Sequence, residues 1–289
     1  MKNEFKIRII VAAIAVTTLL ALFVWKKYIP SFQKTTQPVE IEFKAKNYGE
    51  FAEAYAKGRR GCSNAVYNLL RQHVSSDVAV LDLGCGTGLS TQPLLKMFKE
   101  VYGCDHDIRM LEIAKRNAIN PNIFKKCSAY ELPYENEKFG LVTMFTSFHW
   151  FCDAKAAHEI SRVLKKGGFV YVVDAGKNPF HKELMEIEEK AIGYEVSHPK
   201  KQGYDPEKML TENGFITVVK QEFKDIQKYT VEELLQRYQS NTHWHDVIHS
   251  GKEKEVLDKL RELCISKVNP QDGFIHYENP EKVLLVQKK

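Results

Sequence analysis

Three glycines occupy every second position at the end of an apolar run, in the string VAVLDLGCGTG of residues 78–88. The run is typical of a buried parallel strand, and a glycine-rich turn between a strand and a helix lets the backbone approach a ligand with free amides. The spacing is G-x-G-x-G, whereas dinucleotide-binding loops have G-x-G-x-x-G. Asp82 precedes the turn, and its carboxylate disfavours a pyrophosphate but favours a cation such as the ammonium of an amino acid. The turn therefore predicts a ligand with an amino-acid part and disfavours a nicotinamide-dependent oxidoreductase.

A second carboxylate follows the next apolar segment. Residues 101–105 (VYGCD) predict a short strand that ends in Asp105, about twenty residues beyond the glycines. An acidic residue at this place can accept hydrogen bonds from both hydroxyls of a ribose. Asp107 opens a helical pattern and suits its N-terminal cap. The sequence thus predicts ribose binding by Asp105.

The glycine string resembles motif I of the class I S-adenosylmethionine (SAM)-dependent methyltransferases, whose D-x-G-x-G-x-G loop holds the methionine part of SAM. DHDIRML at 105–111 resembles the family's second motif, and RVLKKGG at 162–168 resembles a turn that follows a later helix. The resemblance implies an α/β fold with a doubly wound, seven-stranded, mostly parallel sheet over residues 44–289. It also implies SAM as the cofactor and a small-molecule methyl acceptor. The cofactor-binding residues predicted in this way are Asp82, Gly84, Cys85, Gly86, Gly88, Asp105, His106, Ser128, Ala129 and Thr146.

Two positions bear on the rest of the site. Ser128 stands where the family usually has an acid that bonds the adenine amine, and a serine hydroxyl makes that bond more weakly. FHWF at 148–151 resembles a small-molecule group that includes the trans-aconitate methyltransferases. His149 in that string is the candidate catalytic base for a hydroxyl acceptor, whereas a carboxylate acceptor needs no base. A hydrogen-bonded pocket or core histidine is the other interpretation of His149.

The N-terminal segment predicts a membrane anchor. Residues 9–25 carry no charge and are flanked by basic residues, and seventeen residues of helix span roughly 25 Å. A cleaved signal peptide and a core helix are the alternatives. We expect an anchor over residues 1–29, a linker over 30–43 and the catalytic domain over 44–289. Because SAM is a cytosolic metabolite, this single-pass membrane protein is expected to place its catalytic domain in the cytosol. The alternative function is a membrane-tethered SAM-fold module without catalysis.

Composition limits the remaining possibilities. The 289 residues include 27% charged residues with a net charge of +5, which does not indicate a nucleic-acid-binding face. Six cysteines are scattered without a C-x-x-C pair, so unpaired thiols in a reducing compartment are expected. The H-x-H-x-x-x-H string of residues 243–249 lacks a completing set of ligands, and no metal site is predicted.

The order of the remaining elements follows from periodicity. Residues 51–74 have a helical pattern, and AEAYAKGR at 52–59 resembles the A-x-x-Y-x-x-x-R of a helix that caps the cofactor pocket in related enzymes; a solvated helix face is the alternative. A capping box at Thr230 predicts a late helix start. Residues 273–277 and 283–287 predict two final strands.

Overall fold

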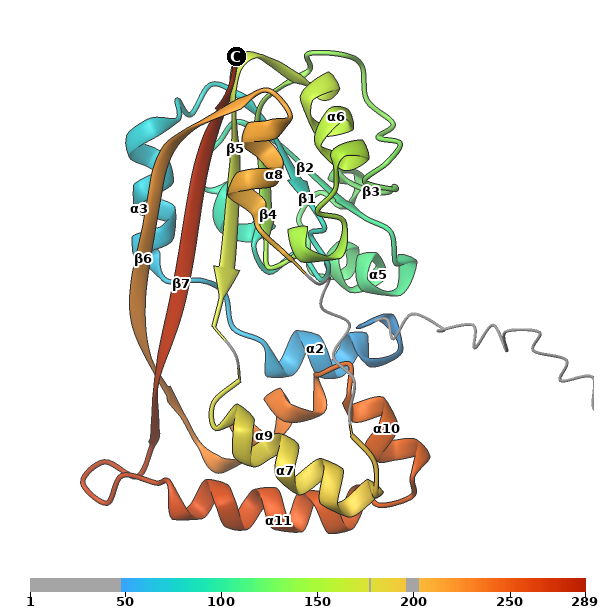
Figure 1. The fold of residues 1–289 in the computed structure, drawn as a ribbon, viewed down its shortest axis with the longest axis vertical. Helices are drawn as coiled ribbons and strands as arrows, with labels where there is room; N and C mark the ends of the chain where they lie inside the picture. Colours follow the sequence, from blue (N-terminus) through green and yellow to red (C-terminus); the bar gives the residue numbers. More distant parts are fainter. Residues whose placement is uncertain (1–47, 177, 196–202) are drawn as a thin grey trace, which may run out of the picture. The chain divides into compact units, whose positions relative to one another are not determined.

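The computed structural model describes residues 48–176, 178–195 and 203–289 (Figure 1). Residues 46–289 form one compact unit. The predicted anchor and linker, residues 1–29 and 30–43, lie outside the described residues, so their assignment stays a prediction. Within the described ranges, every helix is too short or too polar to cross a membrane.

A seven-stranded sheet forms the centre of the unit, in the order β3-β2-β1-β4-β5-β7-β6. The strands are β1 (Ala79–Leu83), β2 (Glu100–Asp105), β3 (Phe124–Lys126), β4 (Phe139–Phe145), β5 (Leu164–Ala175), β6 (Phe215–Tyr229) and β7 (Ile275–Lys288). The first five strands run parallel, and β7 lies antiparallel between β5 and β6. This arrangement confirms the predicted doubly wound, mostly parallel sheet.

Helices cover both faces of the sheet because successive side chains of a strand point to opposite sides. Val80 of β1 packs in one apolar cluster with α3 (Asn64–His73) and α4 (Thr91–Leu95). Its neighbour Leu81 packs in the opposite cluster, with α6 (Ala154–Val163) and α8 (Pro206–Glu212). The near-continuous apolar run of β1 therefore follows from burial on both faces.

The helix that follows β5 and the helices between β6 and β7 build a separate layer, which we call the cap. Figure 1 shows its helices grouped beyond the lower ends of β6 and β7, with α2 beside them. The cap comprises α7 (His181–Ile192), α9 (Val231–Gln239), α10 (Trp244–His249) and α11 (Glu253–Ser266). It has its own apolar core, which contains Tyr238 and Trp244. α2 (Ala52–Gly58) packs against α9.

Several predicted boundaries were wrong. The helical pattern of residues 51–74 is divided into α2 and α3, because Gly58 packs so closely on α9 that a Cβ there would lie 2.5 Å from the carbonyl oxygen of Gln236. The two predicted final strands are one strand, β7, which continues through Pro280. Pro280 is tolerated because β6 and β7 form a two-stranded ribbon there, outside the parallel part of the sheet. The capping box at Thr230 is confirmed.

Candidate active site

The glycine turn is held against the end of β2 by its own backbone. The amides of Gly84 and Cys85 donate to the Cys104 carbonyl at 2.7 and 3.0 Å. Gly84, Gly86 and Gly88 all have positive φ, which disfavours any residue with a side chain. A Cβ on Gly84 would also lie 2.5 Å from the Cβ of Ser147. The turn thus requires glycine at Gly84 for both its backbone angle and its packing.

Asp82 lies beneath the turn and is completely buried. Its carboxylate accepts hydrogen bonds from the hydroxyls of Ser90, Thr91 and Thr143 at 2.7–2.9 Å. Burial raises the pKa of Asp82, and the three hydroxyls oppose this effect. Asp82 therefore ties β1 to β4 and to the start of α4, and its predicted contact with an ammonium stays a prediction.

Asp105 meets the glycine turn directly. Its Oδ2 accepts from the Gly86 amide at 2.8 Å, and its Oδ1 accepts from the Asp107 amide at 2.9 Å. His106 is exposed, and its Nδ1 lies 3.4 Å from Asp105 Oδ1, which raises the pKa of His106. Oδ2 keeps a second lone pair for another donor, whereas Oδ1 also faces His106. The structure thus brings together the two motifs that the sequence singled out, and Asp107 caps α5 (Ile108–Arg116) as predicted.

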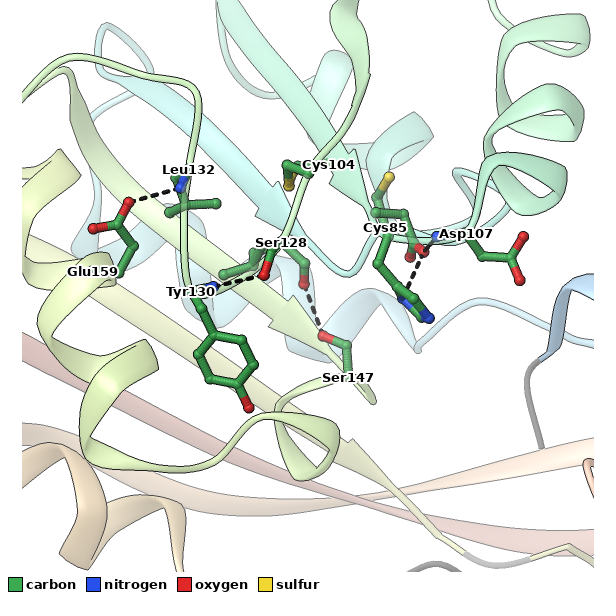
Figure 2. Close-up of a disulfide and its surroundings, with 12 residues drawn as sticks. Cys85, Cys104, Asp107, Ser128, Tyr130, Leu132, Ser147 and Glu159 are labelled. Atoms are coloured by element: carbon green, nitrogen blue, oxygen red, sulfur yellow. Dashed lines mark hydrogen bonds and ion pairs between the residues drawn. A yellow bond between two sulfur atoms is a disulfide. The ribbon is translucent and has the colours of Figure 1, made fainter. Parts of the chain in front are cut away.

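The end of β3 completes this side of the site (Figure 2). Ser128 is exposed, and its Oγ accepts a hydrogen bond from the Tyr130 amide at 3.2 Å, while Ala129 packs at the margin of the sheet's core. One expectation was wrong here: Cys104 and Cys127 form a disulfide between β2 and the end of β3, with 5.8 Å between their Cα atoms. The cysteines are 23 residues apart in the sequence. They meet because Asp105 and Lys126 are register partners on neighbouring strands.

The end of β4 carries the residues predicted for the acceptor side. Thr146 has a φ of 50°, a strained conformation for a β-branched residue, and its amide donates to the Val173 carbonyl at 2.7 Å. His149 lies half-buried on the short helix η3 (Phe148–Trp150). Its ring lies edge-on to Tyr204, with 6.2 Å between the ring centroids. Backbone strain such as that of Thr146 is typical of functional sites.

Sequence reasoning missed the partners of His149. The Tyr204 hydroxyl donates to Asp174 Oδ2 at 2.8 Å, and Asp174 lies near the end of β5. Burial and the Asp174 carboxylate raise the pKa of Tyr204. Tyr204 comes from a segment without a recognisable motif, so only the fold brings it to this edge of the sheet.

The three histidines of the H-x-H-x-x-x-H string have different partners. His243 Nδ1 lies 2.6 Å from Glu188 Oε2, and His245 Nε2 lies 2.8 Å from Glu50 Oε2. His249 Nδ1 contacts the carbonyl of His245 at 2.7 Å. In the part of the chain that the structure describes, no group of three or more potential ligands is placed to hold a metal ion.

Comparison with known proteins identifies the fold and the family. The crystal structure of the YcgJ protein from Bacillus subtilis superposes with a TM-score of 0.50 at 20% identity, over 78% of this chain and 99% of that one, which shows a shared fold. Residues 81–172, which contain the glycine turn and Asp105, match the family model described as a methyltransferase domain. Residues 81–172 therefore form a methyltransferase domain of the class I SAM-dependent kind.

Two curated relatives agree with this methyltransferase assignment. An uncharacterized methyltransferase of Schizosaccharomyces pombe is 28% identical over 166 residues, or 56% of this chain and 64% of that protein. The malonyl-[acyl-carrier protein] O-methyltransferase of Acetivibrio thermocellus is 32% identical over 127 residues, or 43% of this chain and 44% of that protein. The chain therefore spans less than two thirds of the length of either relative.

The residues of this methyltransferase fit SAM as its cofactor. The three positive-φ glycines let the backbone of the turn adopt the left-handed conformation that brings its amides close to a ligand. Asp105 offers acceptor oxygens beside the Gly86 amide. The arrangement suits a nucleoside with an amino-acid part, because the turn can hold the amino acid while the carboxylate accepts ribose hydroxyls.

Proposed function

We propose that this protein transfers the methyl group of SAM to an oxygen of a small-molecule acceptor, either a carboxylate or a hydroxyl. The observation that carries the proposal is the hydrogen bond between the Gly86 amide and Asp105, which joins both cofactor motifs at the carboxyl ends of β1 and β2. Ligands of doubly wound sheets bind at these ends. An oxygen acceptor is supported by the relative from Acetivibrio thermocellus, whose name describes an O-methyltransferase.

Each group of predicted cofactor residues is proposed to hold a different part of SAM. The turn from Gly84 to Gly88 would hold the methionine part, Asp105 with His106 the ribose, and Ser128 with Ala129 the adenine. When bound, SAM supplies an electrophilic methyl group on a sulfonium, so the protein chiefly provides position and exclusion of water. Correct orientation alone can contribute about 7–11 kcal/mol to lowering the barrier.

His149 is proposed to act on the acceptor side. Its place on η3, directly after β4, is next to the strained Thr146 and to Tyr204. A hydroxyl acceptor loses its proton during transfer, and the imidazole is the candidate to receive it. A carboxylate acceptor is already anionic, and His149 would then only shape the pocket.

We also propose that residues 1–29 anchor the protein in a membrane and that the methyltransferase domain faces the cytosol. The proposal rests on the uncharged run of residues 9–25 and on the cytosolic supply of SAM. Alkaline extraction of membranes that contain the full chain should leave the protein in the pellet. Release into the supernatant would contradict the anchor.

The transfer reaction is tested with the full-length protein and SAM labelled in its methyl group. Organic acids and hydroxy compounds, supplied as a panel, should take up label with the wild type but not with Asp105→Asn. Asp77→Asn is the matched control, because Asp77 is an exposed acid paired with Lys99. A wild type that binds S-adenosylhomocysteine but labels nothing would favour the non-catalytic module instead.

A further inference from the structure

α9 of the cap carries a buried cation without an anionic partner. Arg237 is only 5% exposed, and its Nε is shielded from solvent. Among the described residues, its side chain forms no hydrogen bond or ion pair. A guanidinium has five donors and keeps its charge at any physiological pH, so a buried one without partners is unfavourable for folding. The presence of Arg237 at this position is therefore not explained by a contribution to folding stability.

A second guanidinium lies beside the first. Arg59 follows α2, and its Nε and Nη2 donate to Ser240 Oγ at 2.9 Å and to Asn241 Oδ1 at 2.6 Å. Both partners are neutral. Burial first and the positive charge of Arg59 second lower the pKa of Arg237. The two cations therefore repel one another, and the described residues in contact with them provide no carboxylate.

The acids of α9 are engaged with other groups. Glu233 pairs with Arg60 at 3.1 Å, and Glu232 pairs with Arg261. Aromatic rings line the two cations instead. The ring of Tyr55 lies 5.2 Å from Arg59, and the ring of Tyr229 lies 5.9 Å from Arg237. Aromatic faces accept the flat side of a guanidinium and leave its edge free to donate to a planar anion.

This pair of cations is close to the cofactor site. Tyr55 of α2 packs in one apolar cluster with Met110 of α5. Met110 in turn borders the glycine turn, because a Cβ on Gly86 would lie 3.2 Å from its Cε. α2 therefore connects the glycine turn with Arg59, and Figure 1 shows α2 between α5 and the cap helix α9. The side chains of Tyr55 and Met110 thus connect Arg59 with the glycine turn.

We propose that Arg237, together with Arg59, binds a carboxylate of the methyl acceptor, so that the substrate is an organic acid with a second oxygen that receives the methyl group. This inference rests on the methyl transfer proposed above. Two guanidinium groups with no acid beside them favour a ligand group with a net negative charge, such as a carboxylate. The amino-acid end of SAM is a zwitterion, and its ammonium would need an acid nearby. A carboxylate held by two cations is a weakened nucleophile, so Arg237 positions the acceptor while another oxygen reacts.

The proposed step balances. The second oxygen of the acid attacks the methyl carbon, an O–C bond forms, and the C–S bond breaks with its electron pair remaining on sulfur. The products are S-adenosylhomocysteine and the methyl ester or methyl ether of the acid. A second carboxylate reacts without proton release, whereas a hydroxyl gives up one proton, for which His149 is the candidate acceptor.

The test compares Arg237→Gln with Arg261→Gln in the full-length protein. Arg261 is an exposed cap arginine paired with Glu232, so its loss removes one charge without touching the cluster. In the presence of S-adenosylhomocysteine, carboxylates from acetate to adipate, including glutarate, are added at constant ionic strength, with glutaramide as the neutral match. We expect carboxylates, but not glutaramide, to bind and raise the Tm. Arg237→Gln should weaken that binding roughly 10–100-fold, the range for losing a hydrogen bond to a charged group.

The affinities for S-adenosylhomocysteine and for carboxylates decide whether the proposal holds. Affinity for S-adenosylhomocysteine should be the same in both variants, and its loss in Arg237→Gln alone would assign the anion to the cofactor and overturn the proposal. Equal weakening in Arg261→Gln, or no carboxylate binding by a wild type that binds S-adenosylhomocysteine, would also overturn it. Failure of the wild type to bind S-adenosylhomocysteine would instead refute the proposed function.

A further variant separates binding from folding. Arg237→Met replaces a buried, unpaired charge with an apolar side chain of similar length, which should raise the Tm of the free protein while abolishing carboxylate binding. A purely structural arginine would give the opposite sign in the Tm. A lower Tm in Arg237→Met would therefore contradict the inference even if the variant bound no carboxylate.

Discussion

Gly84→Ala is expected to disrupt the glycine turn by an amount that can be worked from its geometry. The residue has a φ of 73°, and its new Cβ would lie 2.5 Å from Ser147 Cβ and 2.8 Å from Ser147 Oγ. The left-handed backbone costs an alanine about 1–2 kcal/mol, and overpacking of this kind costs about 1–3 kcal/mol. The total of about 2–5 kcal/mol corresponds to a loss of roughly 4–20 °C in Tm for a domain of this size.

Gly193→Ala separates the two contributions. Gly193 has a φ of 84°, and a Cβ at this position would have no atom within 4 Å, so its substitution has the backbone cost alone, about 1–2 kcal/mol. Thermal unfolding and urea titration of both variants should show a larger loss for Gly84→Ala. Adding Ser147→Gly to Gly84→Ala should recover part of the difference. Equal losses in the two alanine variants would refute the claim that close packing on Ser147 requires glycine at Gly84.

Three further substitutions test single contacts. Asp82→Ala should destabilise the fold by roughly 2–5 kcal/mol in urea titrations, because two buried hydroxyls and one half-buried hydroxyl lose their acceptor, and a loss below about 1 kcal/mol would contradict this reasoning. Thr146→Gly should stabilise the protein by up to about 1–2 kcal/mol, because it relieves the positive φ of Thr146. The loss of the β-branched side chain's contacts works against this gain. Thr146→Asn measures the backbone effect with a side chain still present, because asparagine tolerates that backbone conformation. The ion pair of His106 with Asp105 raises the pKa of His106, so its stabilisation is complete below pH 6.5 and is lost as the pH rises through the raised value. The unfolding free energy of the wild type should therefore fall between pH 5.5 and 8, and this pH dependence should be weaker in His106→Gln. An unchanged pH dependence in the variant would contradict the pairing of His106 with Asp105.

Local motifs made the glycine turn and its position beside the end of the next strand predictable. The glycine turn and Asp105 depend on residues close in sequence, and the parallel strands must bring their ends together at one edge of the sheet. The same holds for the capping box at Thr230, whose partner Glu233 is three residues away. Prediction succeeded where the geometry is set by a strand, a turn and the following helix.

Contacts between distant segments could not be predicted. Arg59 and its acceptor Asn241 are 182 residues apart, and the charged pattern of α9 gives no sign that Arg237 is buried. The break between α2 and α3 depends on packing against α9, which leaves no local signal beyond Gly58. Two separate final strands were predicted, but pairing with β6 continues β7 through Pro280. Tertiary packing outweighed local preference in each of these cases.

The most direct test of the central claim is calorimetric titration of S-adenosylhomocysteine into the full-length protein, beside Asp105→Asn and the control Asp77→Asn. The account predicts one binding site with micromolar affinity in the wild type and the control. It predicts at least a tenfold weaker affinity in Asp105→Asn, because the ribose hydroxyls lose a charged acceptor. Absence of binding by the wild type, or equal affinity in all three proteins, would contradict the assignment of the glycine turn and Asp105 as the cofactor site.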